Sequence, residues 1–256
     1  MIKLLIEKTL FGEINKIEMA IERAKNFEPK EGYLLAFSGG KDSVAAYYIL
    51  KMAGVKFRAV YSPTSVDPPE LIRFIKDNFP DVEFAKYTET MWELIPRKLL
   101  PPTRLIRYCC DVMKERTGSK GDTVVLGVRW AESNSRKKLP MVGFYKGKII
   151  LRVIIDWSDE DIWEFHRMYN LPHCVLYDRG FKRIGCVGCP LSSNQEKELE
   201  LYPKYKEAYI RAFDRMIANR KAKGKECKWQ NGEEVMKWWI GEVKNTKQID
   251  GQCRMF

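Results

Sequence analysis

The sequence predicts an α/β protein with a doubly wound parallel sheet and a helical C-terminal extension. Short apolar runs of the kind that form buried parallel strands alternate with segments of helical periodicity. Elements that alternate at this spacing indicate βαβ units and a parallel sheet. From about residue 192 the chain becomes strongly helical and basic. We therefore expect a sheet domain over residues 1–190 and a helical, basic extension over residues 191–256.

The expected elements follow one another along the chain. Apolar residues at three- and four-residue spacing predict a helix within residues 10–28, and acidic residues at 159–161 suit the first turn of a later helix. The expected strands are 33–37, 57–61, 82–84, 123–128 and 149–155. The further expected helices are 44–52, 69–79, 159–169 and 232–241.

Composition narrows the class of protein. A chain of 256 residues, 45% hydrophobic and 31% charged, suits one large α/β domain or a domain with an appendage. No apolar run approaches the ~20 residues that cross a bilayer, and no signal-peptide pattern opens the chain. We expect a cytoplasmic protein without a membrane partner. The net charge of +11 suits a polyanionic ligand such as a nucleotide, sulfate or nucleic acid, and it equally suits solubility alone.

A glycine-rich turn between an expected strand and an expected helix is the strongest local motif. It reads Ser38-Gly39-Gly40-Lys41-Asp42-Ser43. Two glycines let the backbone approach an anion, and the following helix N-terminus offers amide groups and a positive dipole end. The spacing is not that of a Walker A loop. The motif resembles the pyrophosphate loop of the adenine-nucleotide α-hydrolases, which implies that residues 38–43 bind nucleotide phosphates.

The seven cysteines suggest metal or redox chemistry. An odd count without a signal peptide argues against a disulfide framework. Cys109 and Cys110 are adjacent, and Cys186 and Cys189 form a CxxC pair followed by a proline. The spacing fits an iron–sulfur cluster, in which each thiolate takes its own iron. It leaves open a zinc site, or two structural cysteines beside a redox CxxC pair.

Several further segments, in order from about residue 30 to about 190, resemble the phosphoadenylyl-sulfate (PAPS) and adenylyl-sulfate (APS) reductase family. The first cysteine pair and Lys114 match its Cys-Cys-x-x-x-Lys segment, and the second pair matches its Gly-Cys-x-x-Cys segment. Gly127-Val128-Arg129 with Ser133 and Arg136 is similar to its Gly-x-Arg…Ser…Arg stretch, and residues 156–163 with Leu171-Pro172 resemble its Trp…Asp-Val-Trp…Leu-Pro segment.

The resemblance implies a [4Fe–4S] cluster on Cys109, Cys110, Cys186 and Cys189. In the implied mechanism the loop and Arg129 bind the phosphosulfate end of the nucleotide, and Lys114 and Arg136 add positive charge near the sulfate. The implied activity is thiol-dependent reduction of APS or PAPS to sulfite, with a thioredoxin-like donor. The family's C-terminal Glu-Cys-Gly-x-His motif is missing, so the nucleophile would be Cys253 or, second, Cys227.

Two other functions stay open at this point. A complete phosphate loop is what relatives that split ATP to AMP and pyrophosphate require, so the chain could be an ATP-pyrophosphatase-type sulfur transferase. Such an enzyme would act on nucleic acid or on a small molecule. The other possibility is a catalytically silent, cluster-bearing protein that only binds a nucleotide or a partner.

Overall fold

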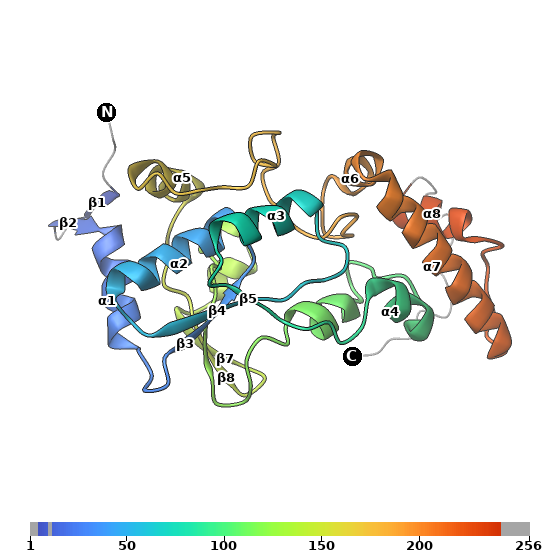
Figure 1. Ribbon diagram of the computed structural model, residues 1–256, viewed down its shortest axis with the longest axis horizontal. Coiled ribbons are helices and arrows are strands. Elements are labelled where there is room, and N and C mark those ends of the chain that lie inside the picture. The colour runs from blue at the N-terminus through green and yellow to red at the C-terminus, as the bar shows by residue number, and fades with distance from the viewer. Residues whose placement is uncertain (1–4, 10–11, 242–256) are drawn as a thin grey trace. The chain divides into compact units, whose positions relative to one another are not determined.

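The computed structural model describes residues 5–9 and 12–241 (Figure 1). The chain divides into two compact units. Met1–Thr88 with Asp111–Gly185 form the first, the sheet unit, and Glu89–Cys110 with Cys186–Phe256 form the second, the helical unit. This division differs from the single boundary expected at residue 190. Residues 89–110 join the helical unit because α4 (Met91–Lys98) packs against α7 (Pro203–Ala222).

A six-stranded sheet, parallel except at one edge, organises the sheet unit. Its order is β5-β4-β3-β6-β8-β7, and only β7 runs antiparallel to its neighbour. The strands are β3 (Tyr33–Phe37), β4 (Phe57–Tyr61), β5 (Glu83–Phe84), β6 (Thr123–Val125), β7 (Val142–Tyr145) and β8 (Lys148–Leu151). The α/β class and the mostly parallel sheet predicted from the sequence are confirmed.

Alternate residues of the strands point to opposite faces of the sheet. One face, which we call the Leu35 face, packs against the helices α1 (Lys16–Asn26), α2 (Lys41–Ala53), α3 (Pro69–Asn78) and α5 (Asp159–Met168). Ala20, Ile49 and Ile75 are fully buried there. The opposite face, the Leu34 face, has a smaller buried cluster of Leu34, Val124 and Ile150. The main core of this unit therefore lies between the sheet and these four helices.

Two strand pairs lie outside the prediction from the sequence. β7 and β8 form a hairpin whose turn uses Lys146 and Gly147, with φ of 49° and 77°. β1 (Ile6–Thr9) and β2 (Gly12–Asn15) form a separate two-stranded sheet before α1. The remaining short elements of this part of the chain are η1 (Cys110–Lys114), η2 (Trp130–Glu132) and η3 (Arg136–Lys138).

The helical unit is built on the long helix α7. It is joined by α4, α6 (Gln195–Leu201) and α8 (Gly232–Ile240). A Cβ on Gly232 would lie 2.3 Å from the Ile210 carbonyl oxygen, so glycine permits the close contact between α8 and α7. Trp239 of α8 packs on Tyr209 and donates its Nε1–H to the Pro102 carbonyl at 2.6 Å. Within the described residues, no helix has the length and apolar character needed to span a membrane.

Candidate functional site

The predicted phosphate loop joins β3 to α2 and turns at two glycines. Gly39 has a φ of 70°, in the left-handed region that favours glycine, and Gly40 is the N-cap of α2. A Cβ on Gly39 would lie 2.7 Å from Leu71 and 2.8 Å from Ile75, so the turn packs directly on α3. The N-terminus of α2 thus lies at the carboxyl end of β3, where open parallel sheets bind ligands.

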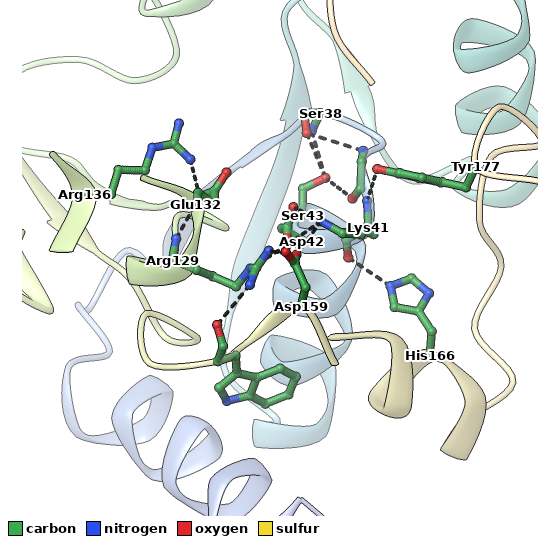
Figure 2. A network of polar contacts seen from close by, with 12 residues as sticks. Ser38, Lys41, Asp42, Ser43, Arg129, Glu132, Arg136, Asp159, His166 and Tyr177 are labelled. Carbon is green, nitrogen blue, oxygen red and sulfur yellow. Dashed lines mark hydrogen bonds and ion pairs between the residues drawn. The ribbon is translucent and has the colours of Figure 1, made fainter. Parts of the chain in front are cut away.

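The two serine hydroxyls of the loop brace the turn from within. Ser43 Oγ donates to the Gly40 carbonyl at 2.9 Å. The same oxygen accepts the Ser38 N–H at 3.2 Å and the Ser38 hydroxyl at 3.0 Å (Figure 2). The hydroxyl hydrogen of Ser43 is therefore used by the loop itself, and a ligand would meet a turn whose shape is already fixed.

The buried guanidinium of Arg129 holds Asp42 in place. Its Nε donates to Asp42 Oδ1 at 2.6 Å, its Nη2 to Asp159 Oδ1 at 2.7 Å and its Nη1 to the Trp157 carbonyl at 2.9 Å (Figure 2). Burial opposes the charge of Arg129, but the two carboxylates outweigh it and raise the pKa of the guanidinium. All three of its nitrogens are thus bonded to protein groups, although the resemblance implied that Arg129 binds phosphosulfate.

Lys41 completes a network of two cations and two carboxylates. Its Nζ lies 3.2 Å from Asp42 Oδ2 and 3.3 Å from Asp159 Oδ1. Burial raises the pKa of Asp159, but Arg129 and Lys41 outweigh it and hold that pKa below its ordinary value. The two positive and two negative charges of this network balance. The charge of an incoming phosphate would therefore be met either by Lys41, after it leaves its carboxylates, or by the backbone amides at the start of α2.

Two aromatic side chains that the sequence analysis did not single out hold the first residue of α2. Tyr177 Oη accepts the Lys41 N–H at 2.9 Å, and His166 Nε2 donates to the Lys41 carbonyl at 2.9 Å (Figure 2). Trp163 packs on both rings, with centroid distances of 5.1 Å to Tyr177 and 5.4 Å to His166. Burial lowers the pKa of His166, which keeps the ring neutral at neutral pH. Tyr177 therefore occupies one of the amides that a phosphate would use.

Gly127, just after β6, touches the backbone of the loop. A Cβ at this position would lie 2.8 Å from the carbonyl carbon and oxygen of Asp42 and 2.9 Å from the Ser43 nitrogen. Backbone atoms cannot give way as a flexible side chain can. Glycine here lets the segment that carries Arg129 pack closely against the start of α2.

Arg136 and Lys114 differ in their surroundings. Arg136 of η3 forms an ion pair with Glu132, and the same carboxylate accepts the Arg129 N–H at 2.9 Å (Figure 2). Glu132 therefore links Arg136 to the segment that holds Asp42. Lys114 is exposed at the end of η1.

The four cysteines predicted to bind a cluster all belong to the helical unit. Cys109 and Cys110 end its first segment, and Cys186 and Cys189 stand at the start of its second. A hydrogen bond with Cys110, burial and the charges of Cys110, Cys186 and Cys189 raise the pKa of Cys109 far above its ordinary value. The other three cysteines therefore act electrostatically on the Cys109 thiol. No three or more Cys, His, Asp or Glu side chains of the described ranges are arranged to hold a metal ion.

The CxxC turn is fixed by α6 and α7. Gly188 has a φ of 70°, and a Cβ there would lie 2.8 Å from Leu199 of α6. Glu198 accepts the Gly188 N–H at 3.1 Å, and the Tyr209 hydroxyl donates to the Val187 carbonyl at 3.1 Å. Arg104 Nε donates to the Pro190 carbonyl at 2.8 Å, which ties the turn to the segment preceding Cys109. The positions of both cysteine pairs are therefore set within one unit.

The two candidate nucleophiles, Cys227 and Cys253, lie in the C-terminal part of the chain. Cys227 lies between α7 and α8, half-buried, with its thiol donating to the Trp229 carbonyl at 3.6 Å. Cys253 falls outside the described residues. The role of either cysteine therefore stays a prediction.

A pocket of about 310 Å³ lies elsewhere in the sheet unit. It is lined by β3, β4, β5 and residues 116–122, and Arg58, Glu83 and Arg116 give it charged walls. None of the residues predicted from the sequence to bind nucleotide lines this pocket.

Comparisons with known proteins agree with the order of the motifs. The family model of the phosphoadenosine phosphosulfate reductase domain matches residues 32–192. The uncharacterized protein MJ0973 of Methanocaldococcus jannaschii is 28% identical over 232 residues, which is 82% of this chain and 54% of that protein. Adenosine 5′-phosphosulfate reductase 2 of Bacillus subtilis is 25% identical over 182 residues, 64% of this chain and 70% of that protein.

One solved structure supports the fold. The crystal structure of phosphoadenylyl-sulfate reductase from Candida auris, a phosphate complex, matches with a TM-score of 0.50 at 16% identity. The match covers 68% of this chain and 88% of that one. This chain spans only about half the length of MJ0973.

Proposed function

The chain belongs to the phosphoadenosine phosphosulfate reductase domain family, and from that premise we propose that it is an iron–sulfur sulfonucleotide reductase. It would reduce APS or PAPS to sulfite with a thiol as nucleophile. Two features of the chain support the proposal: a phosphate loop at the N-terminus of α2 that is fixed by its own serine hydrogen bonds, and two cysteine pairs that belong to the same compact unit.

The nucleotide would bind at residues 38–43. The first-turn amides of α2 and Lys41 would meet the charge of the phosphosulfate, with the helix dipole favouring an anion at this end. The Arg129 guanidinium would not contact the nucleotide directly, because it is bonded to Asp42 and Asp159. Its role is then to fix Asp42 and the start of α2. Lys114 and Arg136 would add positive charge on the phosphosulfate side, as the resemblance implies.

Cys109, Cys110, Cys186 and Cys189 are the residues that would hold a [4Fe–4S] cluster. Four thiols from two pairs match the ligand number of such a cluster, with one thiolate for each iron. Cysteines bind iron as thiolates, so binding of a cluster would release protons from these thiols. When bound, the cluster would influence the site through its charge, which depends on its oxidation state.

The proposed chemistry is a transfer from oxygen to sulfur followed by reduction. A cysteine thiolate attacks the sulfur of the phosphosulfate, a sulfur–sulfur bond forms, and the sulfur–oxygen bond breaks to release AMP or adenosine 3′,5′-bisphosphate. A dithiol donor of the thioredoxin class then reduces the enzyme S-sulfonate, which yields sulfite, the free cysteine and an oxidised donor. Cys253 is the expected nucleophile and Cys227 the second candidate.

In the deciding experiment, anaerobically purified protein is incubated separately with APS, with PAPS and with ATP. Sulfite released from APS or PAPS, together with one sulfonate on Cys253 or Cys227 when the reductant is left out, supports the reductase. Intact-protein mass spectrometry followed by peptide mapping identifies the modified cysteine. If the Cys227→Ser, Cys253→Ser double variant keeps full activity, the reductase assignment is wrong.

A second candidate is an ATP-pyrophosphatase-type sulfur transferase, with nucleic acid or a small molecule as acceptor. The complete sequence of the phosphate loop and the net charge of +11 favour it. Release of pyrophosphate from ATP, with no sulfite from either sulfonucleotide, would select this function. If none of the three substrates reacts, the chain is a nucleotide- or partner-binding protein.

A further inference from the structure

A buried histidine contacts the first residue of α2 and leaves one ring nitrogen unused. His166 of α5 has only 3% of its surface exposed, and its Nε2 donates to the Lys41 carbonyl at 2.9 Å (Figure 2). The hydrogen of the neutral ring is therefore on Nε2, and Nδ1 carries a lone pair. Nδ1 has no hydrogen-bond partner among the described residues. This lone pair is a place where the protein can take up one proton.

The groups that face the ring come from α2 and from the segment after α5. Burial has the largest effect and lowers the pKa of His166. The Lys41 carbonyl, the Asp42 carboxylate and the Leu171 backbone favour the charged ring, whereas His173 opposes it. With burial dominant, the ring is neutral until another negative charge arrives.

The remaining ionisable groups of the segment after α5 do not supply that charge. Burial raises the pKa of both Tyr177 and Cys174, so neither side chain is charged at neutral pH. Asp178 is already paired with His173, with 2.9 Å between Oδ1 and Nε2. A further negative charge near His166 would therefore come from a ligand.

The charges of the phosphate-loop network are matched one to one in the described part of the chain. Lys41 and Arg129 are the cations, and each lies within 3.3 Å of both Asp42 and Asp159. An anion at the start of α2 adds negative charge to a network that is already balanced. One more positive charge beside the first turn would stabilise it.

One residue connects the expected anion site to His166. The Lys41 N–H points to the Tyr177 hydroxyl, and the Lys41 carbonyl accepts from His166. Trp163 packs on both rings and fixes their positions. An anion that takes the Lys41 amide would lie close to the imidazole, and a nearby opposite charge favours the protonated ring.

We propose that His166 is a positioning residue that takes up one proton when an anion binds at the phosphate loop. The proposal rests on the proposed nucleotide binding at residues 38–43. The proton comes from solvent and binds Nδ1, and no other covalent bond forms or breaks. The imidazolium supplies the missing positive charge. Its Nε2–H then donates a stronger, charge-assisted hydrogen bond to the Lys41 carbonyl, which holds the first turn of α2 in place.

Proton uptake makes the affinity for the anion depend on pH. Affinity falls as pH rises from the pKa of His166 in the free protein to its higher pKa in the complex, and it is constant outside this range. A difference of one unit between the two pKa values gives a tenfold fall in affinity. The ligand itself must not titrate in this range. APS meets this condition, whereas AMP does not, because a phosphate monoester has a pKa of about 6.

Calorimetric titration with APS from about pH 5.5 to about pH 8 tests the proposal. The full chain with Cys227→Ser and Cys253→Ser serves as the parent, so that APS is not consumed. Titration in two buffers of different ionisation enthalpy should show uptake of up to one proton per bound APS. The affinity should fall about tenfold over this range, the size of a pKa change of one unit.

Two variants identify the group that takes up the proton. His166→Gln keeps an N–H donor for the Lys41 carbonyl but cannot titrate, so it should lose both the proton uptake and the pH dependence. A purely structural role of His166 would leave the pH profile unchanged. The chain has only two histidines, and His173→Gln is therefore the matched control, which should keep both properties.

Nitrogen NMR of the imidazole rings covers the case in which His166→Gln does not fold. APS should convert the His166 ring of the parent to its charged form at a pH where the free protein has it neutral. The proposal is wrong if APS binds without proton uptake, if the ring stays neutral in the complex, or if His166→Gln keeps the pH dependence. It is also wrong if His173→Gln removes the uptake. If APS binds at no pH, the proposed nucleotide function fails, and this inference fails with it.

Discussion

Replacement of Gly127 by alanine should disturb the phosphate loop, although Gly127 is distant from the loop in the sequence. The added methyl carbon would lie 2.8 Å from the Asp42 carbonyl group, where ordinary contact begins at 3.4 Å. The two backbone segments must then separate by about 0.6 Å. Overpacking of this kind costs about 1–3 kcal/mol. For a chain of this size that corresponds to a fall in Tm of roughly 2–12 °C.

The effect on ligand binding should exceed the effect on stability. The displaced atoms belong to the first turn of α2, whose amides would bind the phosphate, and misplacement by 1 Å can cost about a hundredfold in function. We expect at least a tenfold loss of AMP affinity in Gly127→Ala, measured by titration beside thermal unfolding. Gly185→Ala is the control, because a Cβ there meets no atom within 4 Å. If both variants keep wild-type Tm and affinity, the close contact does not position the loop.

Three further changes have expected outcomes. Gly40→Val should abolish nucleotide binding in a folded protein, because branched bulk would stand where the backbone must approach phosphate; unchanged affinity would place the ligand elsewhere. Anaerobically purified protein should be brown and contain about four irons per chain. The Cys186→Ser variant should lose the colour and the Cys174→Ser variant should keep it. Stoichiometric zinc without iron would contradict the cluster. Tyr177→Phe should tighten binding of AMP by a few-fold because it frees the Lys41 amide, and weaker binding would show that the hydroxyl contacts the nucleotide instead.

The sequence predicted the strands and the loop because both are local patterns. The apolar run 33–37, the glycine turn and the apolar helix after it lie within one short segment. The expected strands 123–128 and 149–155 proved shorter, ending at Val125 and Leu151. Val153, Ile154 and Ile155 continue the apolar run and are buried, but they form a turn, so an apolar run does not mark where a strand ends. Strand β8 lies within the expected strand 149–155, but its antiparallel partner β7 was missed because β7 has four residues, of which the last two are exposed.

The partners of the loop could not be predicted, because they depend on how distant segments meet. Tyr177 and His166 contact Lys41 only after α5 has packed beside α2. A pattern also cannot tell whether a cation meets a ligand or a carboxylate. The family resemblance predicted that Arg129 binds phosphosulfate, but in the structure Arg129 binds Asp42 and Asp159.

The surroundings of Asp42 bear on the choice between the two proposed enzymes. A complete loop favours ATP cleavage only if its aspartate is free for that reaction, for example to bind a metal ion held by the nucleotide. In the structure Asp42 Oδ1 accepts from Arg129 at 2.6 Å, and Oδ2 lies 3.2 Å from Lys41 Nζ. Both oxygens are met by cations, so a metal ion would first have to displace Lys41. Asp42 has a sufficient structural role as the anchor of a buried arginine, and its presence in the loop therefore does not by itself argue for ATP over a sulfonucleotide.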